Sequence, residues 1–260
     1  MQQPWEGRTS VVTGASRGIG RGIALRLGAE GSRVVLCARD QSALEEVAGA
    51  IRSKGGVAEA IALDLRAPDA GGRVVDFAVS RFGRIDVVVN NAGATKRGEF
   101  LELTDEDFAD GFALKFFGAV RLTRAAWSQL KATWGSVVFI GGAGGRTPGA
   151  QFAVGGSVNA ALLSLTKALA DAGVRDGVQV NAINPGTIRT ARYTSRLNAF
   201  AQERGLDPDA AEREFVKNAG IARIGEPEDI AALVAFVAGP EGRLLHGALI
   251  DMDAGATKSI

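Results

Sequence analysis

Residues 11–20, which read Val-Val-Thr-Gly-Ala-Ser-Arg-Gly-Ile-Gly, most constrain how this chain of 260 residues can fold. The apolar run over residues 9–12 predicts a buried strand, and after Gly14 the pattern predicts an amphipathic helix. A strand, a glycine-rich turn and a helix N-terminus form an anion site, because the first N–H groups of the helix lack partners and its dipole favours negative charge. We expect Gly14 to take the tight turn, Gly18 to let the backbone approach a phosphate and Gly20 to allow close helix–strand packing.

Strand-like and helix-like segments alternate along the rest of the chain. Further strands are expected at 33–38, 57–63, 85–89, 136–140, 178–183 and 248–252, and helices at 41–53, 68–82, 104–131, 152–172 and 226–237. Apolar strands separated by helices are typical of a parallel sheet covered on both faces. The sequence therefore predicts an α/β fold with a doubly wound, Rossmann-like parallel sheet in a single domain over residues 1–260.

Composition argues against several other classes. The chain has 30 Lys and Arg against 29 Asp and Glu, so no overall charge attracts nucleic acid or an anionic membrane. The single cysteine, Cys37, lies in an apolar run and is expected in the core, as in a protein of the reducing cytoplasm. The single histidine, His246, cannot form a metal cluster, and no Cys/His spacing suggests zinc, so we expect no metal site. We find neither a signal-peptide pattern nor an apolar run of ~20 residues, so no membrane span is expected.

Four later patterns occur in a fixed order after the glycine turn: Asp64, then Asn90-Asn91-Ala92-Gly93, then Asn184-Pro185-Gly186 with Thr190, and finally Asp253-Ala254-Gly255. Together with residues 13–20 they resemble the short-chain dehydrogenase/reductase family over nearly the whole chain. The resemblance implies a nicotinamide cofactor and a set of residues that hold it. The pyrophosphate and ribose contacts would be Gly14, Ser16, Arg17, Gly18 and Ile19, and the adenine contacts Asp64 and Leu65. Asn90, Ala92 and Gly93 would line the adenosine and ribose path, and Pro185, Gly186, Ile188 and Thr190 would hold the nicotinamide carboxamide.

The residues after the second strand favour NADP(H) over NAD(H). A carboxylate at the end of this strand binds the ribose hydroxyls of NAD, but here the position carries Ala38, followed by Arg39. Arg17 lies in the glycine turn, and two guanidinium groups suit a 2′-phosphate. The alternatives are that these arginines are solvated surface charges, or that Asp40 pairs with Arg39.

The chain departs from the family at its catalytic group of Asn, Ser, Tyr and Lys. Its one tyrosine, Tyr193, is followed four residues later by Leu197, so the family's Tyr-x-x-x-Lys spacing is absent. Matching the helix near residue 155 to the family pattern gives the four positions their occupants in this chain: Gly155 for the tyrosine, Asn159 for the lysine, Gly142 for the serine and Lys115 for the asparagine.

The sequence is compatible with three functions. The first is an NADP(H)-dependent oxidoreductase with non-standard catalytic residues. The second is an inactive NADP(H)-binding sensor or partner subunit, and the third is a non-redox enzyme that reuses the pocket. In the first hypothesis Lys115 supplies charge and a proton, and Asn159 keeps the ribose contact. Gly142 and Gly155 would then leave room for a substrate oxygen near free helix N–H groups. Gln151 and Tyr193 are the candidate substrate contacts, with a packing role as the alternative for Tyr193.

The long helices at 104–131 and 152–172 are apolar on more than one face, with aromatic residues at Phe112, Phe116, Phe117 and Trp127. A helix that is apolar beyond one stripe needs a second partner, which is either the chain's own core or another copy. The family resemblance implies that these helices pair in a homodimer, which the C-terminal segment extends to a homotetramer.

Overall fold

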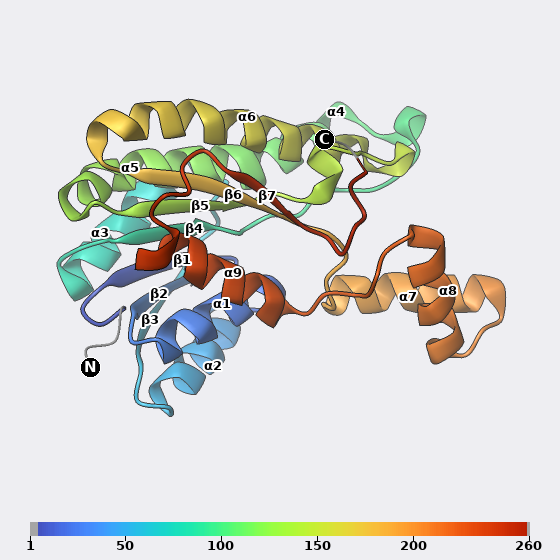
Figure 1. Ribbon diagram of the computed structural model, residues 1–260, viewed down its shortest axis with the longest axis horizontal. Coiled ribbons are helices and arrows are strands. Elements are labelled where there is room, and N and C mark those ends of the chain that lie inside the picture. The colour runs from blue at the N-terminus through green and yellow to red at the C-terminus, as the bar shows by residue number, and fades with distance from the viewer. Residues whose placement is uncertain (1–4, 259–260) are drawn as a thin grey trace.

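The computed structural model describes residues 5–258 and contains a seven-stranded parallel sheet in the order β3-β2-β1-β4-β5-β6-β7 (Figure 1). The strands are β1 (Thr9–Thr13), β2 (Arg33–Ala38), β3 (Val57–Ala62), β4 (Val87–Asn90), β5 (Ser136–Ile140), β6 (Gln179–Pro185) and β7 (Leu249–Met252). The predicted doubly wound α/β fold is confirmed, and the strands expected at 33–38 and 136–140 have those bounds. The strand order reverses between β1 and β4, so a ligand crevice is expected at the carboxyl ends of these two strands.

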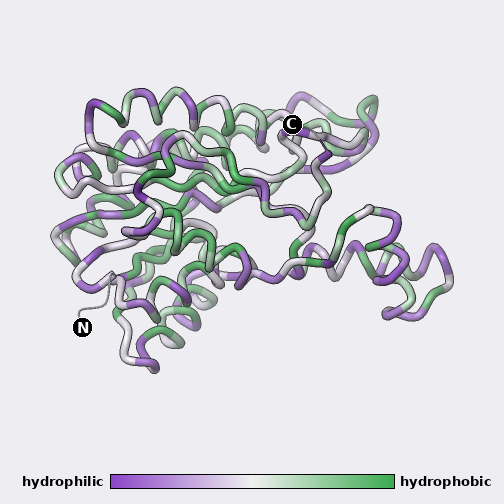
Figure 2. Tube along the Cα trace, in the orientation of Figure 1, coloured by the Kyte–Doolittle hydropathy of each residue, from purple (hydrophilic) through white to green (hydrophobic). Residues whose placement is uncertain are grey.

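Helices cover both faces of the sheet, each over its own apolar core (Figure 1). One layer contains α1 (Gly18–Ala29), α2 (Gln41–Arg52) and α9 (Pro227–Ala238). The other contains α3 (Ala70–Phe82), α5 (Gly118–Thr133) and α6 (Ala153–Asp176). Figure 2 shows the strands in green, as apolar segments between these layers. Because helices cover both faces of the sheet, the strand side chains are shielded from water on both sides.

The helix expected over 104–131 is interrupted in the structure. It begins with a capping box, in which Thr104 and Asp107 each accept a hydrogen bond from the other's backbone N–H group. α4 (Asp105–Gly111) then passes into a π-helical segment, Phe112–Phe117, before α5 continues the helix. π-helical turns often occur at functional sites, and this one carries Lys115.

The stretch Ala150–Asp176, which ends with α6, is long and apolar enough to cross a membrane by length and composition. This stretch includes polar and charged residues such as Asn159, Lys167 and Asp171, and a core helix meets the same description, so it does not overturn the expectation of no membrane span. Val158, Leu162 and Leu163 of α6 are buried within the protein, and the helix lies along the sheet beside α5 (Figure 1). Its apolar character is explained by this packing as a core helix.

Helices α7 (Ala191–Arg204) and α8 (Pro208–Ala219) form a lobe that projects from the sheet (Figure 1). The lobe has its own small core, which includes Tyr193, Leu197 and Ala211. A core this small leaves the lobe dependent on its polar contacts with the rest of the protein.

Cys37 is fully buried in β2, as expected, and burial raises the pKa of its thiol to about 12. His246 is exposed, and its Nε2 lies 2.6 Å from the carbonyl oxygen of Ala170. Among residues 5–258, no group of three or more His, Cys, Asp or Glu side chains is placed to hold a metal ion.

Candidate active site

The glycine turn between β1 and α1 depends on the absence of side chains. Gly14 and Gly18 adopt positive φ angles of 64° and 55°, which favour glycine. A Cβ atom on Gly20 would lie 2.2 Å from the carbonyl oxygen of Gly14. Arg17 precedes α1 in extended conformation and provides no side-chain cap, so the N-terminus of α1 keeps its N–H groups for an anion.

Thr13 and Asn91 connect this turn to the loop after β4. The Thr13 hydroxyl accepts hydrogen bonds from the backbone N–H groups of Asn91 and Ala92, at 2.9 and 3.0 Å. The Asn91 side-chain amide donates to the carbonyl oxygen of Thr13 at 2.9 Å. Sequence analysis listed the neighbours of Asn91 as cofactor contacts but omitted Asn91 itself, although its place in the Asn-Asn-Ala-Gly motif was visible. Its role in the structure is to hold the two loops at the crevice together.

The other expected cofactor residues come from the segments that follow the strands, and Thr190 approaches the glycine turn directly. The methyl group of Thr190, far away in the sequence, is 3.1 Å from where a Cβ of Gly18 would be. Asp64 is exposed and accepts hydrogen bonds from the backbone and guanidinium of Arg66. Asn90 is buried and its amide donates to Thr123 Oγ1 at 2.9 Å, so its side chain is already engaged. The remaining members, Ser16, Ile19, Leu65, Gly93, Pro185, Gly186 and Ile188, are buried or half-buried.

Arg17 and Arg39 are both exposed, and neither forms an ion pair with any residue in the described range 5–258. Asp40, the alternative partner of Arg39, instead caps α2 by accepting a hydrogen bond from the backbone N–H of Ala43 at 3.1 Å. An uncapped helix N-terminus together with two guanidinium groups that form no ion pair in the described residues fits a dinucleotide that carries an additional phosphate.

At the other end of the crevice, Lys115 and Asn159 are in direct contact. The Lys115 ammonium donates a hydrogen bond to Asn159 Oδ1 at 2.6 Å and another to the carbonyl oxygen of Gly141 at 2.8 Å. The stem of Lys115 packs on Gly93, where its Cδ is 2.7 Å from an ideal Cβ position. The structure thus brings together two of the four residues that occupy the family's catalytic positions.

The environment of Lys115 lowers the pKa of its ammonium group. Desolvation by burial, followed by the nearby positive charge of Arg192, lowers the Lys115 pKa to about 7. Arg192 lies close because its Nη2 donates to the carbonyl oxygen of Gly93 at 3.3 Å. A lysine with this pKa exchanges its proton near neutral pH, as a general acid or base must.

The expectation that Gly142 and Gly155 leave open space is wrong. An ideal Cβ on Gly155 would lie 2.1 Å from the ring of Phe152, so that ring fills the place of a side chain. An ideal Cβ on Gly142 would lie 2.8 Å from the amide nitrogen of Asn159. Neighbouring side chains have moved into the positions that the two glycines vacate, which sequence spacing alone could not reveal.

The two candidate substrate residues point to other partners. Tyr193 is 3% exposed and its hydroxyl donates to Glu212 Oε2 at 2.9 Å, within the lobe. Burial and Glu212 raise the Tyr193 pKa to about 12, which disfavours proton exchange at neutral pH. Gln151 is exposed and its amide donates to Glu99 Oε1 at 2.7 Å. The structure therefore corrects the interpretation of Tyr193 from substrate contact to packing residue, and it places Gln151 against the loop after β4.

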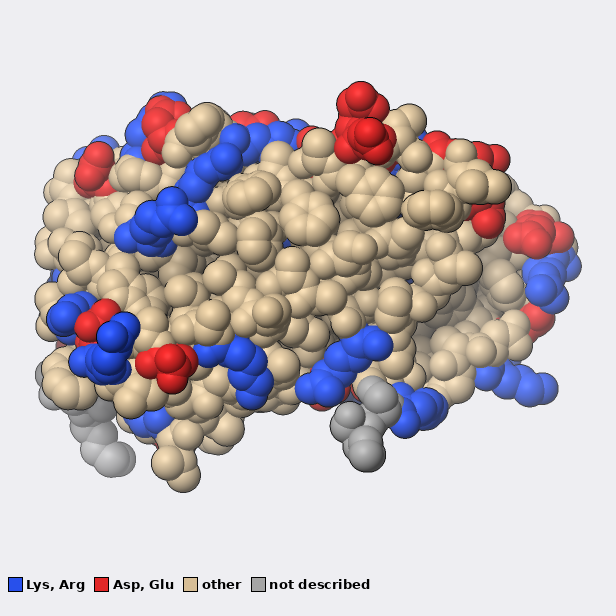
Figure 3. Space-filling view, turned by 90° about the horizontal axis from the view of Figure 1, so that it is seen from above, with Lys and Arg blue, Asp and Glu red and all other residues tan. Residues whose placement is uncertain are grey.

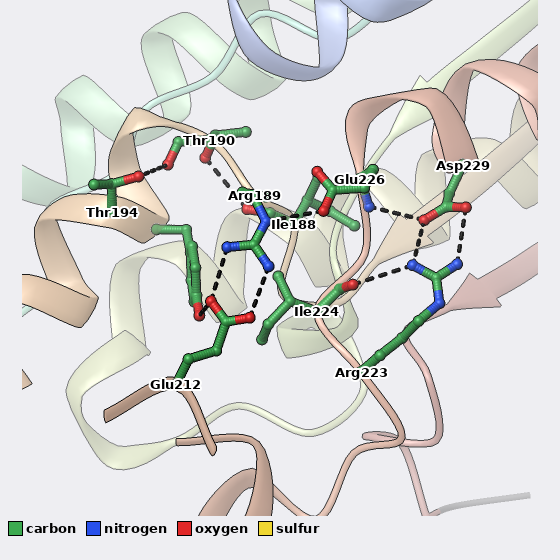
Figure 4. A network of polar contacts seen from close by, with 10 residues as sticks. Ile188, Arg189, Thr190, Thr194, Glu212, Arg223, Ile224, Glu226 and Asp229 are labelled. Atoms are coloured by element: carbon green, nitrogen blue, oxygen red, sulfur yellow. Dashed lines mark hydrogen bonds and ion pairs between the residues drawn. The ribbon is translucent and has the colours of Figure 1, made fainter. Parts of the chain in front are cut away.

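Arg189 holds the lobe to the helix layer below the sheet (Figure 4). Its guanidinium donates two hydrogen bonds of 2.7 Å to Glu212 of α8 and one of 2.9 Å to Glu226, which precedes α9. Arg223 forms a similar forked pair with Asp229 of α9. The network fixes the segment that leads from β6 past Thr190 into the lobe.

Comparison with known proteins agrees with this geometry. Residues 14–257 match the family model described as "Enoyl-(Acyl carrier protein) reductase". The chain belongs to the short-chain dehydrogenase/reductase family. It is 35% identical, over 96% of its length and 92% of the relative, to an uncharacterized oxidoreductase of Mycobacterium tuberculosis. It is also 34% identical to the short-chain reductase protein NovJ of Streptomyces niveus, over 95% and 92% of the two chains.

Among solved structures, this short-chain dehydrogenase/reductase is similar to the L-sorbose reductase of Gluconobacter frateurii in complex with NADPH and L-sorbose. The two share 29% sequence identity with a TM-score of 0.95, and the match covers 100% of each chain. Relatives named as oxidoreductases or reductases support an oxidoreductase function for the family member described here.

Proposed function

We propose that this chain is an NADP(H)-dependent oxidoreductase that interconverts a carbonyl compound and an alcohol, with Lys115 as its acid–base residue. The observation that carries the proposal is the hydrogen bond between Lys115 and Asn159. In the family pattern the first position holds an asparagine and the second a lysine, so the charge and the amide are exchanged. Gly142 fits this exchange, because a side chain there would collide with the Asn159 amide.

The proposed cofactor contacts are the glycine turn, Arg17 and Arg39 at the phosphate end, and the segment from Pro185 to Thr190 at the nicotinamide end. Support comes from the uncapped N-terminus of α1, from the two unpaired guanidinium groups and from the similar reductase that binds NADPH. When bound, NADPH supplies the hydride for carbonyl reduction.

The chain's own contribution is the proton. An ammonium group has three N–H donors, and Lys115 uses two of them on Asn159 and Gly141. The third is left for a substrate carbonyl oxygen, which takes the proton as negative charge develops on it. Because burial lowers the Lys115 pKa to about 7, both the protonated and the neutral form are accessible near neutral pH. The two fixed acceptors hold the nitrogen in place throughout.

One observation favours a second candidate, an inactive NADP(H)-binding protein. The ring of Phe152 occupies the space beside Gly155, at the family's tyrosine position. If this ring also blocks the substrate, the cofactor binds and no chemistry follows.

A turnover screen separates the two candidates. NADPH consumption is followed with a panel of ketones, aldehydes and enones, for the wild type and for Lys115→Met. We expect wild-type turnover of at least one compound and a loss of 100-fold or more in the variant, with NADPH binding retained. Equal turnover in Lys115→Met contradicts the assignment of Lys115. NADPH binding without turnover of any compound supports the inactive candidate.

We also propose that the protein is a cytoplasmic homodimer or homotetramer that pairs through α5 and α6. Figure 3 looks onto this side of the molecule and shows a broad uncharged band between charged margins. Phe117 and Val174, in the segments that would pair, are 46% and 72% exposed. Light scattering at micromolar concentration should give at least twice the mass of one chain, whereas a monomer mass contradicts the proposal.

A further inference from the structure

Four cationic side chains from three parts of the chain gather beside the proposed catalytic centre. Lys115 comes from the π-helical segment, Arg97 from the loop after β4, and Arg192 and Arg196 from α7. None of the four forms an ion pair within residues 5–258. Lys115 is half-buried, whereas Arg97, Arg192 and Arg196 are exposed. A group of like charges in one region is offset when an anionic ligand binds there.

The contacts place these cations around one space. Lys115 and Arg192 share Gly93, since the lysine stem packs on its Cα side and the guanidinium donates to its carbonyl oxygen at 3.3 Å. Arg97 lies over the ring of Phe152, with its Cζ 4.0 Å from the ring centre. That ring in turn covers Gly155. Arg192 and Arg97 therefore lie next to the residues around Lys115, while Arg196 lies over the ring of Phe215 in the lobe, with its Cζ 5.4 Å from the ring centre.

Their charges act on one another. After desolvation, the largest cause, the charge of Arg192 lowers the pKa of Lys115. Arg196 and Arg192 lower the pKa of Arg97 in the same way, again after desolvation. Arg192 therefore lies within electrostatic range of both Lys115 and Arg97.

Two carboxylates of the surrounding segments, Glu99 and Glu212, are engaged by other residues. Glu99 accepts a hydrogen bond from Gln151 at 2.7 Å, and Glu212 is held by Arg189 and Tyr193. Unneutralised like charges destabilise a fold, and at a binding site they are offset when an anionic ligand binds. Guanidinium groups suit carboxylate and phosphate oxygens because their forked donors match the geometry of these anions.

We propose that the substrate is an anionic carbonyl compound whose carboxylate or phosphate group is bound by Arg97, Arg192 and Arg196 while its carbonyl oxygen meets Lys115. The inference rests on the proposed function, since it concerns the substrate of that same site. It also assigns a role to the lobe, because Arg192 and Arg196 belong to α7 and Arg97 to the opposite loop.

Calorimetric binding to the protein saturated with NADP+ tests the proposal without requiring turnover. The probes are two matched pairs: benzoylformate with neutral benzoylformamide, and dihydroxyacetone phosphate with neutral dihydroxyacetone. We expect the anionic member of at least one pair to bind tenfold tighter or more, and the favoured pair identifies the anion as carboxylate or phosphate.

Arg192→Gln should remove most of this preference, about tenfold in affinity, without changing the thermal midpoint by more than a few degrees. Arg175→Gln, an exposed position near the far end of α6, is the matched control and should leave the preference unchanged. Equal binding of charged and neutral members in both pairs, or an unchanged preference in Arg192→Gln, overturns the inference. Tight anion binding without turnover supports this inference while it contradicts the proposed oxidoreductase function.

Discussion

The phosphate end and the catalytic end of the site differ in which atoms surround their glycine residues. At the phosphate end, Gly14 and Gly20 let the backbone of two loops meet, and main-chain atoms together with the Asn91 side-chain amide fill the space. At the catalytic end, Gly142 and Gly155 are surrounded by other side chains, the Asn159 amide and the Phe152 ring. The first region keeps the family pattern because its geometry depends on backbone atoms. The second has changed several residues together, because side chains can exchange places while the backbone remains.

The largest effect is expected from a substitution that disrupts the glycine turn at the phosphate end. In Gly20→Val the new Cβ would lie 2.2 Å from a backbone oxygen, so the turn itself must move. We expect a loss of about 3 kcal/mol of unfolding free energy and no measurable NADPH binding. The measurements are denaturant unfolding and NADPH fluorescence.

Gly49→Ala is the matched control, because a Cβ there meets nothing within 4 Å in the middle of α2. It should stabilise the protein by about 0.4–1 kcal/mol and leave binding unchanged. A Gly20→Val protein that binds NADPH normally would contradict the role given to this turn.

The next effect concerns the exchanged pair. Asn159→Leu removes one of the two acceptors of the Lys115 ammonium. We expect the rate of NADPH-dependent reduction to fall about 100-fold, because the lysine loses its position and its proton. Ser157→Ala, an exposed position on the same helix, serves as the control and should keep the wild-type rate. If both variants react equally fast, the pair does not act as a unit.

A smaller effect separates the two cofactors. The double variant Arg17→Gln with Arg39→Gln should bind NADPH about tenfold more weakly or worse, because charge-assisted contacts are worth ~1.5–3 kcal/mol. NADH affinity should stay the same. Arg21→Gln, one turn further along α1 and also exposed, is the control. A double variant that loses affinity for both cofactors equally would contradict specific recognition of the 2′-phosphate.

The smallest effect is on stability. The Lys115 pKa is about 7 in the folded protein and near its ordinary value of 10.5 when unfolded. The unfolded state therefore binds more protons between these values, and Lys115 makes the fold more stable as the pH rises. From pH 7 to pH 8 the wild type should gain about 1 kcal/mol relative to Lys115→Met in denaturant unfolding. A constant difference between the two proteins would show that the lysine pKa is not lowered.

The sequence allowed the fold to be predicted because the strands are short, apolar and separated by clear turns. It also located the contact partners Lys115 and Asn159, since their positions follow from the family spacing. It did not reveal the π-helical segment that presents Lys115, because a π-turn leaves no distinct periodicity in so short a stretch. Nor did it reveal Phe152 on Gly155, which depends on a side-chain rotamer, or the Tyr193–Glu212 contact, which depends on how α8 folds back on α7.

The most direct test of the exchanged catalytic pair is the pH dependence of kcat/KM for carbonyl reduction, measured from pH 5.5 to 9.5 with the best substrate of the screen. Protonated Lys115 is the form that donates, so activity should be full below pH 6 and fall about tenfold per pH unit above an inflection near 7. Lys115→Arg, whose guanidinium keeps its proton over this range, should lack the inflection. A wild-type profile that stays flat to pH 9, or an inflection near 7 that persists in Lys115→Arg, would contradict the assignment of Lys115 as the proton donor.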